Sequence, residues 1–470
     1  MPFVVLVEGR WVEQSVPLNR TTSKTTPLLF TLERIDDNHA MIPIYRGGSG
    51  LLDMIKFSDI FSTPQKNGIY KSKEFHGYGV KIINMGEIFT HPIIDSIEMK
   101  RVSLSDSELR NFSVKKGDLL FARRSLVESG AGKCSIVGDV GEDVVYESSI
   151  IRVRLDIASS NPRYFWYYFT LGHGRTLIKS IVTGAGQFGI RGTELAKLKI
   201  QYPPLVYQNK IAAIGEKYDK LLSNLSQIIN SLENILNMLF RSWFIDFDPV
   251  KAKAEGKLPF GMDEEIAELF PDSFVDSELG LIPSGWEVGK LSDIAKITMG
   301  TSPPGESYCD LDSGILPLLN GAGDFNDSII APKQGTTQPT KIANDGDFVF
   351  CIRATIGNLS VCEEKYCIGR GVASARERNW FDRGFLHQTI SNLFRVWEWE
   401  ATGSVIKGIT GPEVKNAPVV LPPESIRKSF ENTVMESMLM IQKCMNLEGS
   451  LSTCLEALLP RLMSGELSIS

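Results

Sequence analysis

The chain has 470 residues, of which 43% are hydrophobic and 23% are charged. This composition is ordinary for globular proteins and excludes a wholly disordered or fibrous chain, and the length predicts about three domains. The seven cysteines form no C-x-x-C pair, which disfavours a zinc ribbon or a disulfide scaffold and favours a cytoplasmic location. No apolar stretch approaches the ~20 residues that a membrane-spanning helix needs.

Charge is distributed unevenly along the chain, although the net charge is −6. Residues 51–205 carry 21 basic and 16 acidic groups, which gives +5, whereas residues 243–282 carry 3 and 10, which gives −7. The first block suits a polyanionic partner, and the second block suits solvent or a basic partner.

Three short blocks occur twice in the chain, in the same order. Residues 56–60 (KFSDI) match 290–294 (KLSDI), 117–121 (GDLLF) match 346–350 (GDFVF), and 190–195 (IRGTEL) match 409–414 (ITGPEV). Each copy then ends in a proline pair, at 203–204 and at 422–423. The chain is therefore predicted to contain a duplicated domain rather than a solenoid of small repeats.

Residues 1–53 have no counterpart in front of the second copy. They are either an N-terminal extension of uncertain order or the product of a start assigned too early, with Met54 as the alternative first residue. We prefer the second explanation.

The first copy, residues 54–204, is predicted to mix irregular strands with helices. The Gly117-Asp118 turn precedes an apolar run at 119–122, and further β-rich runs occupy 144–146 and 150–154. Asn161-Pro162 is typical of a helix start and precedes an aromatic segment. The second copy, residues 283–421, repeats the pattern with a strand expected at 348–351.

Each copy is followed by a long predicted helix, at 205–245 and at 422–470. The first shows apolar residues at alternating spacings of three and four, which indicates a heptad seam: Ile211, Ile214, Tyr218, Leu221, Leu225, Ile228, Leu232, Ile235 and Leu239. The second repeats this rhythm more weakly at Met440, Cys444, Leu447, Leu451, Cys454 and Leu458. Residues 246–282 between the first helix and the second copy form an acidic linker.

The predicted fold is therefore α+β. Two similar α/β domains are separated by two long helices that pair as an antiparallel coiled coil, with pseudo-two-fold symmetry from the internal repeat. The alternative is that each long helix packs separately on its own domain.

Motifs for catalysis fail on inspection. Residues 184–189 match G-x-G-x-x-G, but no acidic residue follows at 201–210, as a dinucleotide site would require. Residues 130–134 end in cysteine where a phosphate-binding loop has serine or threonine. Asn161–Tyr164 departs by one residue from the Asn-Pro-Pro-Tyr motif of amino-methyltransferases, and we interpret it as a helix cap. The five histidines show no metal-ligand spacing. We predict no catalytic and no metal-binding residues.

Polar residues near the repeated strands and glycine loops are candidates for DNA contact. Arginine reads guanine, glutamine reads adenine, and lysine and threonine hold phosphates or single base edges. The predicted DNA-binding set is Arg123, Arg124, Lys133, Gln187, Arg191, Arg353, Thr355, Asn358, Lys407 and Thr410.

Two strings stand at the ends of the long helices: 239–250 (LFRSWFIDFDPV) and 458–467 (LLPRLMSGEL), and 282–286 (IPSGW) opens the second copy. With the two-unit repeat and the heptad helices, these residues resemble the specificity subunits of type I restriction-modification systems. The resemblance covers residues 54–470, with 1–53 departing from the usual family start.

The resemblance implies that 54–204 and 283–421 are target-recognition domains, each reading one half of a split, asymmetric site in double-stranded DNA. It implies that the helices set the spacer and dock two modification (methyltransferase) subunits, joined by ATP-dependent restriction subunits. It further implies that this chain is non-catalytic and binds no cofactor, and that S-adenosylmethionine, ATP and magnesium serve its partners.

Two other classes stay open. A coiled-coil scaffold with two protein-binding heads would use the same helices without reading DNA. Part of a fused restriction-methylation enzyme would need a cofactor-binding fold and a nuclease carboxylate cluster, which the sequence does not display.

Overall fold

The computed structural model describes residues 2–7, 10–15, 54–326, 329–353, 355–401 and 408–467. The chain divides into one unit of residues 1–48 with Ser470 and a second unit of residues 49–469. In the first unit, β1 (Pro2–Val7) pairs antiparallel with β2 (Arg10–Ser15). The rest of what was expected for residues 1–53 lies outside the described residues. None of the helices in the described ranges combines the length and the apolar character that crossing a bilayer requires.

Domain 1 (residues 54–204) is built on two sheets. The main sheet has the strand order β4-β12-β8-β10-β6, and the second has the order β11-β5-β7. The strands are β4 (Phe61–Asn67), β5 (His76–Ile83), β6 (Ile93–Ile94), β7 (Lys100–Val102), β8 (Leu119–Ala122), β10 (Cys134–Val137), β11 (Val144–Tyr146) and β12 (Ile150–Leu155). The predicted strands at 119–122, 144–146 and 150–154 are thereby confirmed. Leu120, Val137 and Tyr146 of the two sheets share one buried cluster.

Shorter elements frame these sheets. They are β3 (Met54–Lys56), β9 (Arg124–Ser125), β13 (Phe188–Gly189), β14 (Lys199–Gln201), α1 (Met85–Thr90), α2 (Asp106–Phe112), α3 (Pro162–Thr170), α4 (Gly172–Ser180) and α5 (Gly192–Lys197). The helix predicted at Asn161-Pro162 is α3, and the Asn161 side chain caps it by accepting from the backbone N–H of Arg163 (2.9 Å) and Tyr164 (3.2 Å). The aromatic residues of α3 are buried and fill the domain core.

Domain 2 (residues 283–421) repeats this architecture. Its sheets have the orders β18-β28-β25-β26 and β19-β23-β20-β27-β24. The elements are β17 (Glu287–Lys290), α9 (Leu291–Ile294), β18 (Ala295–Met299), β19 (Tyr308–Cys309), β20 (Leu316–Leu319), β21 (Phe325–Asn326), β22 (Ile329–Ile330), β23 (Gln334–Thr336), β24 (Ile342–Ala343), β25 (Phe348–Arg353), β26 (Thr355–Val361), β27 (Tyr366–Ile368), β28 (Val372–Glu377), α10 (Arg383–Ala401), α11 (Gly411–Lys415) and β29 (Pro418–Leu421).

The predicted internal repeat is confirmed at the level of strand register. The order β4-β12-β8-β10 in domain 1 corresponds to β18-β28-β25-β26 in domain 2, and every neighbouring pair is antiparallel. The carboxylate of the Gly-Asp turn also has the same partner in both copies. Asp118 accepts from the Arg154 guanidinium at 2.6 and 2.7 Å, and Asp347 accepts from Arg376. Because both aspartates are buried, each arginine neutralises a carboxylate that would otherwise lose its hydration without compensation.

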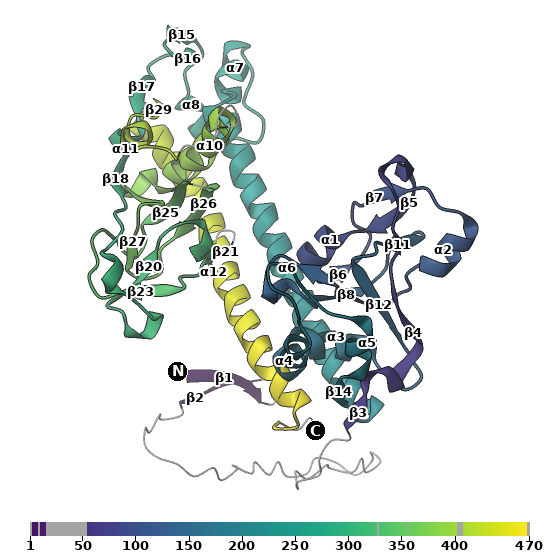
Figure 1. Ribbon diagram of the computed structural model, residues 1–470. Coiled ribbons are helices and arrows are strands. Elements are labelled where there is room, and N and C mark those ends of the chain that lie inside the picture. Colours follow the sequence, from purple (N-terminus) through teal and green to yellow (C-terminus); the bar gives the residue numbers. More distant parts are fainter. Residues whose placement is uncertain are drawn as a thin grey trace. The chain divides into compact units, whose positions relative to one another are not determined.

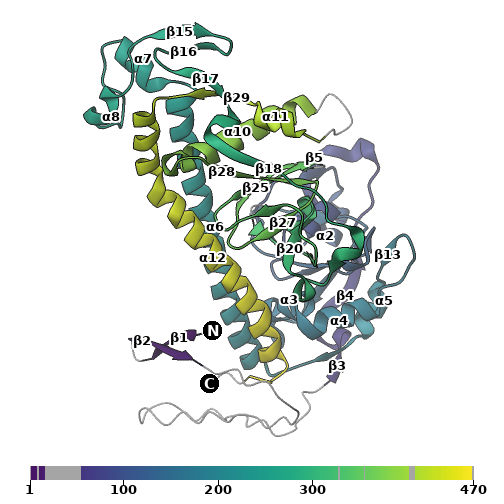
Figure 2. The ribbon, with the colours of Figure 1, turned by 90° about the vertical axis from the view of Figure 1, so that its left-hand side faces the viewer.

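The two long helices are α6 (Leu205–Phe244) and α12 (Glu424–Met463), each of 40 residues. They run antiparallel and side by side (Figures 1 and 2). Tyr207, near the start of α6, donates through its hydroxyl to the Leu462 carbonyl at the end of α12 (3.2 Å), and Ser226 donates to Glu448 near the middle (2.6 Å). The expected antiparallel pair is therefore present, and separate packing of the helices is not observed.

Each long helix also completes the core of the domain at its far end. Leu455, Leu459, Leu462 and Met463 of α12 are buried in the core of domain 1 together with Ile211 of α6. The equivalent positions of α6, which lie 219 residues earlier, are buried in the core of domain 2: Leu236, Phe240, Trp243 and Phe244. This reciprocal exchange is the structural basis of the pseudo-two-fold symmetry.

The predicted seam is corrected by the structure. Leu225 is buried at 6% exposure, but Ile228 is 45% exposed, and Leu221 and Ile235 are likewise exposed. The residues that face α12 near the middle are Leu225 and Ile229, which meet Cys444. The apolar spacing in the sequence combines two adjacent rows of side chains on α6, and only one of these rows faces α12. A straight α-helix drifts relative to a strict heptad, so one heptad pattern does not stay on one face.

The acidic segment 246–282 contains regular elements of its own. They are α7 (Asp248–Ala254), α8 (Glu264–Glu268), β15 (Phe274–Ser277) and β16 (Gly280–Pro283). Val250, Phe270 and Ile282 are buried in the core that α6 and domain 2 share. The segment is therefore packed against domain 2 and is more than a connection.

Candidate nucleic-acid interface

The glycine loops and the repeated arginines come together in both domains. In domain 1, β9 pairs with β13, which sets Gly189 opposite Arg124. A Cβ atom at Gly189 would approach the Arg123 carbonyl oxygen to 2.8 Å, and one at Gly408 in domain 2 would approach Cγ of Arg353 to 2.5 Å. Each loop therefore needs glycine at this point, because the chain passes directly over the arginine-bearing strand.

Three of the candidates in domain 1, Arg124, Gln187 and Arg191, are exposed. Arg123 is half-buried, and its guanidinium donates to the Ser148 carbonyl at 3.4 Å. These four side chains lie on or beside the β9–β13 pair. A guanidinium group that projects into solvent next to a polar loop can donate to a phosphate or a base edge without first breaking a strong internal contact.

Lys133 is directed differently from the other candidates. Its ammonium donates to the Phe89 carbonyl at 2.7 Å and lies over the Phe89 ring. Burial, and secondarily the charge of Arg175, lower the pKa of Lys133 below its ordinary value. In this structure the Lys133 ammonium links the start of β10 to α1, which contains Phe89. DNA contact by Lys133 stays a prediction.

The candidates in domain 2 are more scattered. Arg353 is exposed at the end of β25. Asn358 adopts a left-handed backbone conformation (φ 53°) in β26, at the point where the register with β25 shifts, so a local backbone role is evident. Thr410 caps α11 by accepting from the Glu413 N–H at 3.4 Å, whereas its counterpart Arg191 stands at the start of α5 without a side-chain cap.

Two candidates are outside what can be placed. Lys407 lies outside the described residues, and for Thr355 only the backbone, as the first residue of β26, is described. Their proposed roles remain predictions from the sequence.

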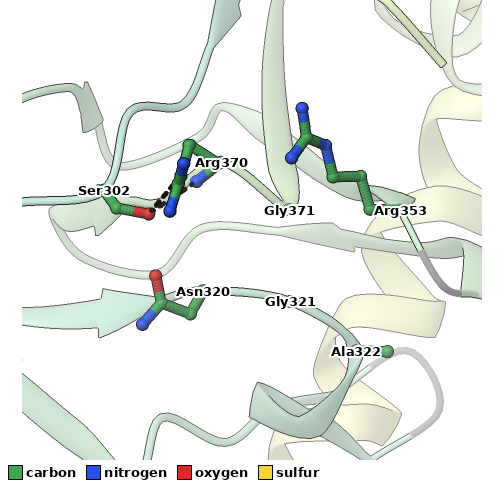
Figure 3. A pocket seen from close by; sticks show the side chains of 7 residues that line it. All are labelled: Ser302, Asn320, Gly321, Ala322, Arg353, Arg370 and Gly371. Atoms are coloured by element: carbon green, nitrogen blue, oxygen red, sulfur yellow. Dashed lines mark hydrogen bonds between the residues drawn. The ribbon is translucent and has the colours of Figure 1, made fainter. Parts of the chain in front are cut away.

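A pocket of about 370 Å³ opens beside Arg353 (Figure 3). It is lined by Ser302, Asn320, Gly321, Ala322, Arg353, Arg370 and Gly371. Arg370 directs its backbone N–H (3.4 Å) and its Nε (3.3 Å) to the Ser302 hydroxyl oxygen. Two guanidinium groups therefore border one recess that is otherwise lined by small or neutral residues.

Sequence reasoning missed Arg370. It follows Gly369 in the turn between β27 and β28, and in domain 1 the equivalent residue is a serine, so comparing the two copies gave no signal. Only the fold brings it next to Arg353, which is on a different strand.

Among the described residues, no group of three or more His, Cys, Asp and Glu side chains is arranged to hold a metal ion. The seven cysteines are unpaired, and five of them, such as Cys134 and Cys351, are buried.

Comparison with known proteins identifies the family to which this architecture belongs. The family model described as "Type I restriction modification DNA specificity domain" matches residues 52–234 and again residues 283–429. Two copies of a DNA-specificity domain, joined by paired helices, define the class. The chain belongs to the type I restriction-modification specificity family, and the resemblance found in the sequence is confirmed.

Similar proteins come from archaea and bacteria. A Methanocaldococcus jannaschii protein assigned as the MjaX type I restriction enzyme specificity subunit is 27% identical over 372 residues, which covers 78% of this chain and 82% of that protein. The MjaIX specificity subunit of the same organism is 25% identical over 65% of this chain and 69% of its own length. The crystal structure of a type I S subunit from M. genitalium shares the fold, with a TM-score of 0.52 at 12% identity, and the alignment covers 92% of this chain and all of that one.

Proposed function

We propose that this chain is the DNA target-recognition subunit of a type I restriction-modification complex, and that domain 1 and domain 2 each read one half of a bipartite, asymmetric target. The observation that carries the proposal is the pair of matching scaffolds held in reciprocal arrangement by α6 and α12. Equivalent positions of the two scaffolds carry different side chains, such as Arg191 and Thr410. A pseudo-symmetric reader with unlike heads suits a target whose two halves differ in sequence.

The partners of the proposed subunit are two modification subunits, which carry the methyltransferase chemistry and S-adenosylmethionine. Support comes from the exposed apolar stripe beside the helix seam, formed by Leu221, Ile228 and Ile235 on α6. The positions 219 residues later on α12 are also exposed: Met440, Leu447 and Cys454. Two equivalent apolar stripes beside one seam offer two equivalent docking sites, because burying such surface is favourable on association.

In this proposal the chain itself catalyses nothing and binds no cofactor. Restriction subunits that use ATP and magnesium would be further partners of the complex. The two rival classes make different predictions for DNA: a scaffold with protein-binding heads would show no sequence-specific affinity, and a fused enzyme would turn over by itself.

The decisive experiment exchanges domain 1. Residues 54–204 are replaced by the matching domain of a related subunit, the full chain is co-expressed with its modification subunits, and methylated adenines are mapped across the genome. One half of the methylated motif should change while the other half stays the same. The reciprocal exchange of residues 283–421 is the control and should alter the opposite half. A motif that changed in both halves, or in neither, would contradict independent reading.

A further inference from the structure

The pocket beside Arg353 is shaped and charged for a specific contact. The Nε of Arg370 donates to the Ser302 hydroxyl oxygen, which also accepts from the Arg370 backbone N–H, so this contact orients the guanidinium. This arrangement leaves the two terminal nitrogens of Arg370 available to the pocket, and Arg353 extends beside the same recess (Figure 3). A Cβ atom on Gly321 would meet nothing within 4 Å, so the wall is open at this residue.

Backbone hydrogen bonds identify the corresponding place in domain 1. The Ile352 N–H donates to the Gly371 carbonyl at 2.9 Å, and the Arg123 N–H donates to the Ser149 carbonyl at 2.8 Å. In the neighbouring turn of domain 2, the Gly369 N–H donates to the Leu319 carbonyl at 2.8 Å. In domain 1, the Glu147 N–H donates to the Ile83 carbonyl at 3.0 Å. These pairs match Arg353 with Arg124, Arg370 with Ser148, Asn320 with Asn84 and Gly321 with Met85.

The two places share a scaffold but differ in the side chains that face outward. Arginine and asparagine recur at two positions, whereas Arg370 is replaced by Ser148 and Gly321 by Met85. In domain 1 a second guanidinium is also present, because Arg123, which lies between β8 and β9, donates to the Ser148 carbonyl. A constant frame with changed side chains is what two readers of different sequences require.

We propose that Arg353 and Arg370 together read a guanine in the half-site of domain 2, with Ser302 orienting Arg370. This inference rests on the proposed function and names residues that carry it out. A guanidinium matches the O6 and N7 acceptors of guanine when it is presented at a fixed angle. A phosphate contact needs charge more than orientation, so the Ser302 contact that orients the Arg370 guanidinium favours the base edge.

The test uses Arg370→Lys and Arg370→Ser in the full chain, assembled with its modification subunits. Lysine keeps the charge but loses the bidentate fork, and serine is the residue that the protein itself carries at the equivalent position of domain 1. Both variants should relax one position of the second half-site in the methylated motif, the position of the guanine. Discrimination at that position should fall by about 5- to 150-fold, the range expected for one bidentate contact.

Arg124→Lys is the control in domain 1. Arg124 corresponds to Arg353, and the substitution makes the same arginine-to-lysine change at the equivalent place of the other domain. It should affect the first half-site and leave the second intact. If Arg370→Lys and Arg370→Ser retain the parental motif, base reading by Arg370 is overturned. A retained motif with a salt dependence of binding reduced by about one phosphate contact in the serine variant would identify a backbone contact instead, which also overturns the proposal. Failure of the proposed function is separate, because the parental complex would then show no bipartite motif at all.

Discussion

Replacing Leu459 by alanine should lower the unfolding free energy of domain 1, although Leu459 belongs to α12, the last helix of the chain. Leu459 is fully buried in the cluster that contains Phe57, Trp166 and Ile211 of the opposite end of the sequence. Removing a buried leucine side chain costs about 2–5 kcal/mol, because transfer free energy is lost and a cavity remains. A loss of about 3 kcal/mol would raise the population of opened domain 1 by roughly 140-fold.

The assay is hydrogen exchange of the full chain, read by mass spectrometry in peptides from β8 and β12 against peptides from β25 and β28. Leu459→Ala should speed exchange in β8 and β12 and leave β25 and β28 protected. Phe240→Ala, at the equivalent position of α6, should do the reverse at a cost of about 3–5 kcal/mol. Leu447→Ala, exposed on α12, is the control and should change neither. Equal loss of protection in both domains after either core substitution would refute the reciprocal arrangement.

Two further predictions concern the seam and the pH dependence. Leu225→Asp should lower the free energy of unfolding, measured by urea denaturation, by several kcal/mol because it buries an unpaired charge. Ile228→Asp should change that free energy by no more than about 0.5 kcal/mol and should instead weaken binding of the modification subunits. Equal destabilisation by both would show that Ile228 is not on the surface. Burial, followed by the charge of Arg383, lowers the pKa of His387 to about 4 from its ordinary value of 6.5. At His387 the unfolded chain then binds more protons than the folded one between these values, so this residue should cost domain 2 stability as the pH falls from 6.5 towards 4. His387→Leu should make the slope smaller in denaturation curves taken across that range.

The domain duplication was legible in the sequence because it depends on local patterns. Gly117-Asp118 and Gly346-Asp347 start equivalent strands, Asn161 caps a helix as its neighbours predict, and the long helices begin directly after their proline pairs. Each of these features is decided by residues within a few positions of one another. The family strings at the helix ends were also visible, although their packing role was not.

Contacts between distant segments were decided only by the tertiary structure. Apolar spacing determined that α6 has an apolar face but not which of two adjacent rows meets α12, and so Leu225 is buried while Ile228 is exposed. The same limit applies to polar side chains: Lys133 turns towards Phe89, and Thr410 caps a helix. Arg370 joins Arg353 because β25 and β28 are neighbours in the sheet. A side chain's direction and partners depend on what lies across from it in space, and one sequence records that information only through the complete fold.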